Sequence, residues 1–222
     1  MRTVRGLVLA GLVALMGGCA IAGFLADKVV PPRVDAIYKL PDRPTAILVD
    51  DRTNCLGDPA MPGIIAVQAG SDLQQVKALT TVIDPARIVD LAARLGPKFR
   101  DMPVDQVGKA VGAQQVLYIN VAQTSIEGTP GILRPTAQVY VKLVKVSDGS
   151  EIFPHLRPGS EFSGSPAEMG YPLLVRSQYK SDQDAQAIMP MLRRAMAHEI
   201  GRAVAELFYT HEPRKRGLEY QR

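Results

Sequence analysis

The sequence predicts an α/β fold of the α+β kind, with a single mixed sheet of about four to five strands, flanking helices and a long carboxy-terminal helix. Runs rich in β-branched residues, such as TAILVDD at 45–51 and QQVLYINVAQTSI at 114–126, are typical of strands. Between such runs apolar residues recur at helical spacing, over the longest stretch at 183–209. About 200 residues follow the apolar amino-terminal segment, enough for one hydrophobic core.

The first half of this domain is expected to alternate between strands and helices. Asp84 can cap a helix whose first position is Pro85, and Gly96-Pro97 stops that helix. Gly112 suits the carboxy-terminal cap of the next helix. In order, we expect a buried strand at 45–51, a loop at 54–63, a helix at 64–79, a short strand at 80–84, the helix capped by Asp84, and a short helix from 103 to 112.

The second half is expected to be mostly strand until the closing helix. The segment 114–126 carries apolar residues on both faces, which indicates a central strand covered on each side. Asp148-Gly149 predicts a tight turn, and Pro190 predicts either the start of the closing helix or a kink in it. In order, we expect the central strand, a turn-rich stretch at 127–135, strands at 136–146 and 151–153, a surface excursion at 154–182 with at most one short strand near 173–178, and a helix at 183–209.

The amino terminus has the features of a secretion signal. Arg2 and Arg5 precede a run without charge through Gly18, as in the basic and apolar regions of a signal peptide. The stretch LMGGC resembles the lipobox of bacterial lipoproteins, although Met16 stands where Leu is most common. That resemblance implies cleavage between Gly18 and Cys19, and acyl chains such as palmitate on Cys19. Acyl chains on this cysteine would hold the protein at a membrane.

Two other interpretations of this segment stay open. The uncharged run continues to Asp27, which is long enough for an uncleaved membrane-spanning helix, although it holds several glycines and no preceding aromatic belt. Ordinary signal cleavage is the remaining possibility. With Ala20 rather than Asp after the cysteine, analogy with enterobacterial sorting favours the outer membrane, facing the periplasm.

These signals divide the chain into four parts. We expect a lipoprotein signal peptide at 1–18, a lipidated cysteine and proline-rich tether at 19–44, the α/β domain at 45–210, and a basic tail at 211–222. Removing Arg2 and Arg5 lowers the formal charge from +4 to +2, so nothing indicates a nucleic-acid partner. If Cys19 is acylated, Cys55 has no disulfide partner within the chain.

Three segments of the domain carry a family resemblance. VIDPARIVDLAARLG, VDQVGKAVGAQQVLYINVAQ and AQVYVKLVKVSDGSEIF together resemble the periplasmic α/β domain of several bacterial envelope proteins. These are the amino-terminal domain of TolB, the curli secretion lipoprotein, the lipoprotein activators of penicillin-binding proteins and the Pel polysaccharide export lipoprotein. The resemblance implies a part in envelope assembly or export, with a protein partner. It also implies homo-oligomerisation, because such domains often pack into rings or pairs.

Few residues suggest catalysis or metal binding. The three histidines, at 155, 198 and 211, lack the spacing of a metal site, and neither a serine elbow nor a phosphate-binding loop is present, so we expect no metal and no cofactor. Asp50 and Asp51 could serve acid/base chemistry, but adjacent strand residues point to opposite faces, and a cap at the strand end is the simpler interpretation. Cys55 lacks a nearby histidine that would activate its thiol.

The function expected from these observations is binding or scaffolding, without catalysis, by a membrane-anchored envelope lipoprotein. The main alternative is a small hydrolase that uses Asp50 or Asp51 with Cys55 or a loop serine, and this predicts a pocket that joins them. A glycan-binding module is less favoured because the chain has no tryptophan. Basic residues of the tail could contact anionic lipid or an acidic partner: Arg214, Lys215 and Arg216.

Overall fold

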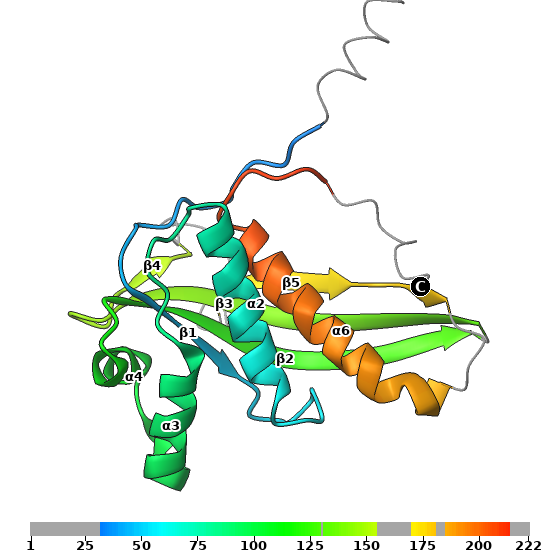
Figure 1. The fold of residues 1–222 in the computed structure, drawn as a ribbon, viewed down its shortest axis with the longest axis horizontal. Helices are drawn as coiled ribbons and strands as arrows, with labels where there is room; N and C mark the ends of the chain where they lie inside the picture. The colour runs from blue at the N-terminus through cyan, green and yellow to red at the C-terminus, as the bar shows by residue number, and fades with distance from the viewer. Residues whose placement is uncertain (1–31, 130, 155–169, 181–184, 214–222) are drawn as a thin grey trace, which may run out of the picture. The chain divides into compact units, whose positions relative to one another are not determined.

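The computed structural model describes residues 32–129, 131–154, 170–180 and 185–213 (Figure 1). Its strands are β1 (Thr45–Asp50), β2 (Gln115–Thr129), β3 (Ile132–Lys145), β4 (Glu151–Phe153), β5 (Tyr171–Arg176) and β6 (Tyr179–Lys180). Its helices are α2 (Met61–Gln75), α3 (Pro85–Leu95), the 3₁₀ helix η1 (Gly96–Asp101), α4 (Val104–Val111) and α6 (Ala185–Glu206).

All the strands belong to one mixed sheet. Its order is β1-β2-β3-β4, and β5 and β6 also pair with β3, giving six strands. β1 runs parallel to β2, with Thr45 opposite Gln115, whereas the other pairs of named strands are antiparallel. The predicted fold class is therefore confirmed, with more strands than the four to five expected.

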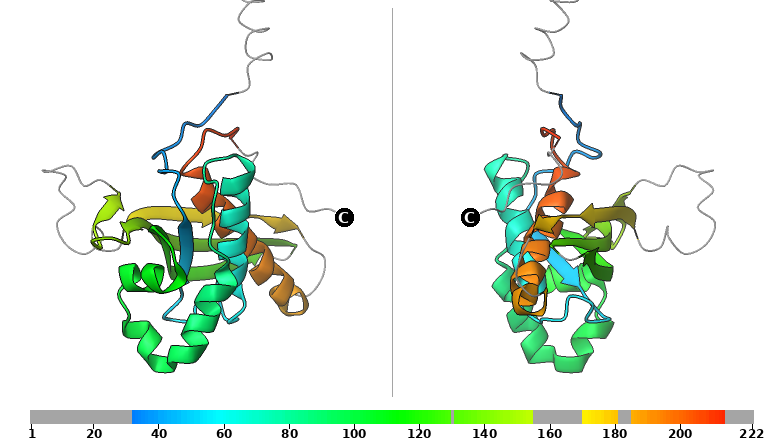
Figure 2. Two further views of the ribbon diagram at one scale, coloured as in Figure 1. Left: turned by 60° about the vertical axis from the view of Figure 1, so that its left-hand side comes forward. Right: turned by 90° about the vertical axis from the view of Figure 1, so that its right-hand side faces the viewer.

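The sheet has an apolar layer on each face because side chains alternate along a strand. Ile47 of β1 and Leu117 of β2 face the core shared with α2 and α6, whereas Leu48 and Val116 face a second core shared with α3 and α4. The helices α2 and α6 lie side by side across one face in Figure 1 and in the turned views of Figure 2. Apolar residues on both faces of β2, predicted from the sequence, are thus explained.

Local signals placed the ends of α3 and α4 correctly. The side chain of Asp84 accepts a hydrogen bond from Ala86 N at 2.9 Å, and Pro85 is the first residue of α3. Gly112 ends α4 in the left-handed conformation, with φ of 82°, which costs glycine little. After Gly96 the chain continues as η1 rather than leaving helical structure at once.

The predicted strand at 80–84 is wrong. Its residues make only an isolated parallel bridge, Thr45 to Val82, with the Thr45 N–H donating to Thr81 O at 3.0 Å and Ile83 N–H donating to Thr45 O at 2.8 Å. The chain turns at Asp84 into α3, so too few residues remain to extend the ladder.

The predicted turn-rich stretch at 127–135 is also wrong. The strands continue almost to the tip of a long hairpin, where Thr129 pairs with Ile132. A Cβ atom on Gly128 would lie 2.2 Å from the carbonyl oxygen of Ile132, so the backbones approach too closely there for a side chain. Gly128 therefore allows the two paired strands to come this close, and it does not mark a turn.

The helix α6 begins at Ala185, before Pro190, so this proline does not start it. Pro190 lies inside the helix, two residues before buried Leu192. As the sixth residue of the helix, Pro190 lies beyond the first turn and removes one amide hydrogen bond from it. The apolar stripe predicted for this helix is buried: Ile188, Leu192, Met196, Ile200, Val204 and Leu207.

The chain divides into two compact units, and the larger spans 36–209 with 215–222. In this larger unit the packing begins before β1: Leu40 is 5% exposed in the core, and the N–H groups of Ile37 and Tyr38 donate to Leu207 O. Residues 36–44 therefore belong with the folded unit, whereas 19–31 of the expected tether lie outside the described residues.

The smaller unit comprises residues 1–35 and 210–214. Its described part contains one antiparallel bridge, in which Val34 and His211 exchange backbone hydrogen bonds of 2.8 and 3.0 Å. Among the helices of the described residues, none combines the length and apolar composition needed to cross a bilayer. The segment expected to be either a signal peptide or a membrane anchor lies outside those residues.

Candidate functional site

The polar residues singled out by the sequence lie where the parallel pair β1 and β2 ends. Asp50 is the last residue of β1 and stands opposite Asn120 of β2. In open α/β sheets, ligands bind outside the carboxyl ends of parallel strands. This end of the sheet is therefore the first place to look for a site.

Asp50 is held by two donors on one of its oxygens. Its Oδ2 accepts a hydrogen bond from the Tyr118 hydroxyl at 2.7 Å and another from Arg52 Nε at 2.9 Å. Burial, and then the Asp50 carboxylate, raise the pKa of Tyr118, so its hydroxyl remains protonated and donates. The bond to Asp50 likewise raises the pKa of Arg52.

Asp51 is engaged in a separate network. Its Oδ1 accepts from Cys55 N at 2.8 Å and from the Cys55 thiol at 3.2 Å, and its Oδ2 accepts from Leu56 N at 3.0 Å. These bonds fix the loop after β1 as an aspartate-capped turn. Asp50 faces the α3 and α4 side and Asp51 caps this loop, so the two carboxylates make separate contacts.

Cys55 is poorly suited to be a nucleophile. Burial raises the pKa of its thiol, and the hydrogen bond to Asp51 raises it further. The Sγ atom also lies 3.6 Å from Val121 O, as expected for a protonated thiol that donates. The thiolate is the reactive form, and this environment disfavours it.

A cavity of about 180 Å³, here called the strand-end cavity, opens beside Asp50. Its lining combines apolar walls with a few polar groups: Leu48, Val49, Asp50, Asp51, Arg52, Phe99, Arg100, Met102, Val104, Val107 and Tyr118. Asp50 and Asp51 line this cavity but Cys55 does not. The cavity therefore does not join the two carboxylates to the thiol, as a hydrolase that uses Cys55 would require. Four of these lining residues were not predicted from the sequence: Tyr118, Arg52, Phe99 and Met102. Only the position of Tyr118, on the same strand face as Val116, could have suggested it.

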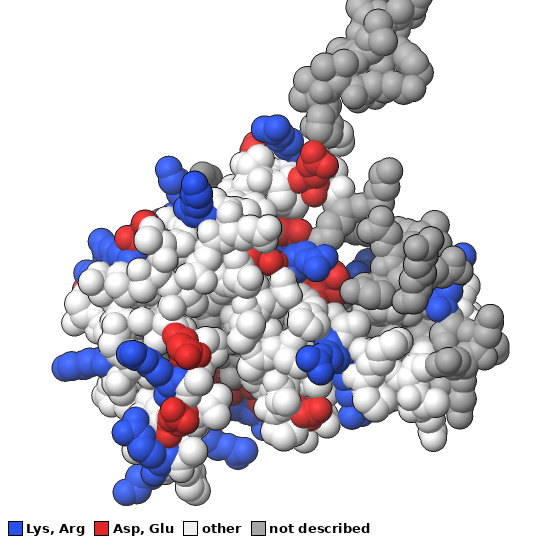
Figure 3. Space-filling view, in the orientation of Figure 1, with Lys and Arg blue, Asp and Glu red and all other residues white. Residues whose placement is uncertain are grey.

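A second, wider hollow of about 770 Å³ lies between α3 and α4. It is lined by Arg87, Asp90, Ala93, Arg94, Lys109, Ala110, Val111 and Gly112. Arg87 Nη1 lies 3.4 Å from Val111 O at the end of α4. Figure 3 shows Lys and Arg side chains gathered with a few acidic ones over the α3 region, so this face is mixed in charge.

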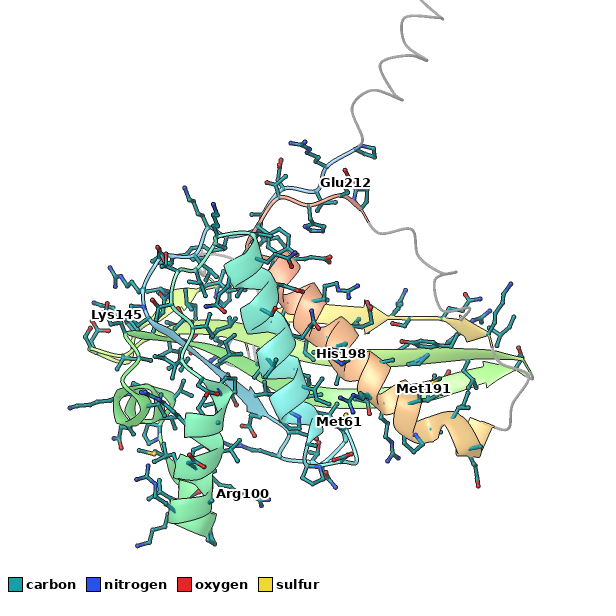
Figure 4. The ribbon with its side chains drawn as sticks, viewed as in Figure 1. Met61, Arg100, Lys145, Met191, His198 and Glu212 are labelled. Atoms are coloured by element: carbon teal, nitrogen blue, oxygen red, sulfur yellow. The ribbon has the colours of Figure 1, made fainter. Side chains whose placement is uncertain are left out.

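The other candidate residues within the described ranges do not come together in a site. His198 projects from α6 toward α2, where its Nδ1 lies 2.9 Å from Gln68 Oε1 (Figure 4). Within the described ranges no group of His, Cys, Asp and Glu side chains could hold a metal ion. The predicted lipidation and cleavage residues Cys19 and Gly18 lie outside the described residues, as do His155 and the basic residues of the tail, Arg214, Lys215 and Arg216.

Comparison with known proteins gives only distant likenesses. No protein-family model and no curated protein matches the chain. The lipoprotein GNA1162 from Neisseria meningitidis aligns at 14% identity and a TM-score of 0.39, over 72% of this chain and 99% of that one. A PelC dodecamer from Paraburkholderia phytofirmans aligns at 13% identity and 0.37, over 81% and 97%. The hypothetical protein CT253 from Chlamydia trachomatis aligns at 12% and 0.40, over 75% and 98%. The chain is thus similar to a lipoprotein and to PelC at low identity, and no family is assigned to it.

Proposed function

We propose that the chain is a bacterial lipoprotein, anchored through Cys19 to the outer membrane, whose α/β domain binds a protein partner in the periplasm. The observation that carries this proposal is the order of signals: Arg2 and Arg5, then an uncharged segment, then GGC, all ahead of a folded unit that begins at Ala36. Acylation of a cysteine in that position places the domain on the far side of the inner membrane.

The hydrogen bonds that the candidate catalytic side chains already make within the protein support binding rather than catalysis. The carboxylate of Asp51 caps a loop, and the thiol of Cys55 donates to it with a raised pKa. Asp50 is held by Tyr118 and Arg52. A general base or nucleophile needs a free lone pair directed at substrate; both oxygens of Asp51 and the thiol of Cys55 are instead engaged in the loop, and Asp50 keeps only Oδ1 free.

Self-association is a further part of the proposal. It is supported by the resemblance of residues 45–154 to envelope domains that pack into rings or pairs. Sedimentation of the full-length chain over a wide concentration range would test it. A species of constant monomer mass across that range would rule it out.

The anchor is tested by comparing wild type with Cys19→Ala in a bacterium that processes lipoproteins. Intact mass should show loss of residues 1–18 and added acyl chains in the wild type only, and the variant should leave the membrane fraction. Cys55→Ala is the matched control and should be processed as the wild type. An uncleaved wild-type mass with unchanged membrane binding in Cys19→Ala would instead identify a membrane-spanning anchor.

A further inference from the structure

The strand-end cavity has the size of a single side chain. Its volume is about 180 Å³, whereas pockets for small molecules usually measure about 300–1,000 Å³. A dry cavity of about 150 Å³ is enough to hold one benzene molecule. The cavity therefore accommodates one ring-sized group and little more.

The lining of this cavity offers apolar walls and one free acceptor. Leu48, Phe99 and Met102 contribute apolar surface, and Asp50 contributes a carboxylate whose side chain is 19% exposed. Both donors to that carboxylate, Tyr118 and Arg52, bond to Oδ2. Among the described residues no group donates to Oδ1, so an incoming O–H or N–H group can bond there.

The charges around the cavity favour a neutral occupant. The negative charge of Asp50 is already matched by Arg52, which is 68% exposed at the rim. Arg100 adds a second positive charge to the lining and Asp51 a second negative one, so the charges that line the cavity balance. A lysine or arginine would bring an unbalanced charge into this partly buried cavity at the cost of its hydration, whereas a neutral donor would not.

We propose that the strand-end cavity receives one tyrosine or tryptophan side chain of a partner protein, its ring against the apolar walls and its O–H or N–H donated to Asp50 Oδ1. This inference rests on the proposed binding function and names the chemistry of the contact. Tyrosine and tryptophan dominate protein interfaces as anchors in small desolvated pockets with polar rims. Such an anchor needs no larger cavity because the rest of its chain lies on the surface.

The test titrates the full-length chain in detergent micelles with capped amino acids while methyl resonances of Leu48 and Val107 are followed by NMR. N-acetyl-tyrosinamide should shift these resonances, and N-acetyl-phenylalaninamide, which lacks only the hydroxyl, should bind about threefold to tenfold more weakly. In Asp50→Asn, the donors Tyr118 and Arg52 require the amide oxygen in the place of Oδ2. The amide NH₂ group then takes the place of Oδ1, so a donor replaces the free acceptor. This variant should lose the preference for tyrosine. Asp90→Asn removes the same charge in the hollow between α3 and α4 and should keep that preference.

Each result supports or overturns the proposal. Equal binding of the tyrosine and phenylalanine probes to the wild type, or absence of shifts at both methyl sites, would overturn it without any variant. Binding of free p-cresol but not of the capped tyrosine would assign the cavity to a small molecule instead. Because the assay does not depend on acylation, its failure leaves the Cys19 anchor intact, and failure of the anchor leaves the cavity result intact.

Discussion

Replacing Gly201 of α6 by alanine should destabilise the protein, although alanine is the better helix former. A Cβ atom there would lie 2.7 Å from the carbonyl oxygen of Ile65 and 3.1 Å from the N atom of Ala69, both backbone atoms of α2, whereas ordinary contacts begin at 3.4 Å. Backbone atoms cannot rotate away, so α2 must shift. Overpacking of this kind costs about 1–3 kcal/mol, against about 1 kcal/mol gained in helix propensity. We expect a net loss of about 1 kcal/mol in the free energy of unfolding, or about 2–4 °C in Tm.

The matched control is Gly63 of α2, where nothing lies within 4 Å of the added Cβ atom. Gly63→Ala should stabilise the protein by about 0.5–1 kcal/mol through the unfolded state and helix propensity alone. Urea unfolding of both variants, followed by circular dichroism, measures the two changes. If Gly201→Ala stabilised the protein as much as Gly63→Ala, the close approach of α2 to α6 would be refuted.

Three further predictions concern single side chains of the folded unit. Leu40→Ala should lower the free energy of unfolding by about 2–4 kcal/mol in urea, because Leu40 is buried although it precedes β1; a loss below half that would place it outside the core. Hydrogen bonds from the Thr80 hydroxyl and N–H lower the pKa of Asp42 from 3.8 in the folded protein. The stabilisation that the ionised Asp42 carboxylate contributes is therefore present above pH 3.8 and is lost as the pH falls through its lower pKa in the folded state. Urea midpoints between pH 2 and 5 should show less acid dependence in Asp42→Asn, and an unchanged profile would contradict this. Iodoacetamide should modify Cys55 more slowly at pH 8 than free cysteine, and Asp51→Asn should speed the reaction, as peptide mapping by mass spectrometry can check.

Prediction from the sequence succeeded where a local signal had one physical meaning. Asp84 followed by Pro85 has few uses other than starting a helix, and Gly112 after an apolar turn has few uses other than ending one. The apolar positions of 183–209 likewise indicated a buried helix face, which α6 confirms.

Prediction from the sequence failed where a glycine or proline is compatible with either a turn or a strand. In the segment 127–135 Gly128 and Pro135 suggested turns, yet both lie inside strands, because pairing with a long partner strand overrides local propensity. At 80–84 the β-branched composition suggested a strand. How many of these residues can pair with β1 depends on where α3 begins, and composition does not show this.

The candidate site could be predicted only in part. Asp50 and Asp51 were placed correctly at the end of a strand, and their separate roles follow from the alternation of strand faces. The strand-end cavity depends on Phe99 and Met102, which reach Asp50 only because η1 folds back after α3. A contact between residues so far apart in the chain has no local signal.

The parallel pairing of β1 with β2 also implies an order of assembly for a chain that is synthesised amino end first. β1 emerges early, but its neighbour in the sheet begins only at Gln115, so β1 waits unpaired while the intervening helices emerge. The β2–β3 hairpin, in contrast, can close as soon as Ile132 has passed. Sheet formation then starts from the hairpin, and β1 is added to it afterwards, since distant contacts form more slowly than local ones. Until that moment the apolar residues of β1 are unpaired and can associate with other chains, so any protection must come from chaperones rather than from the fold.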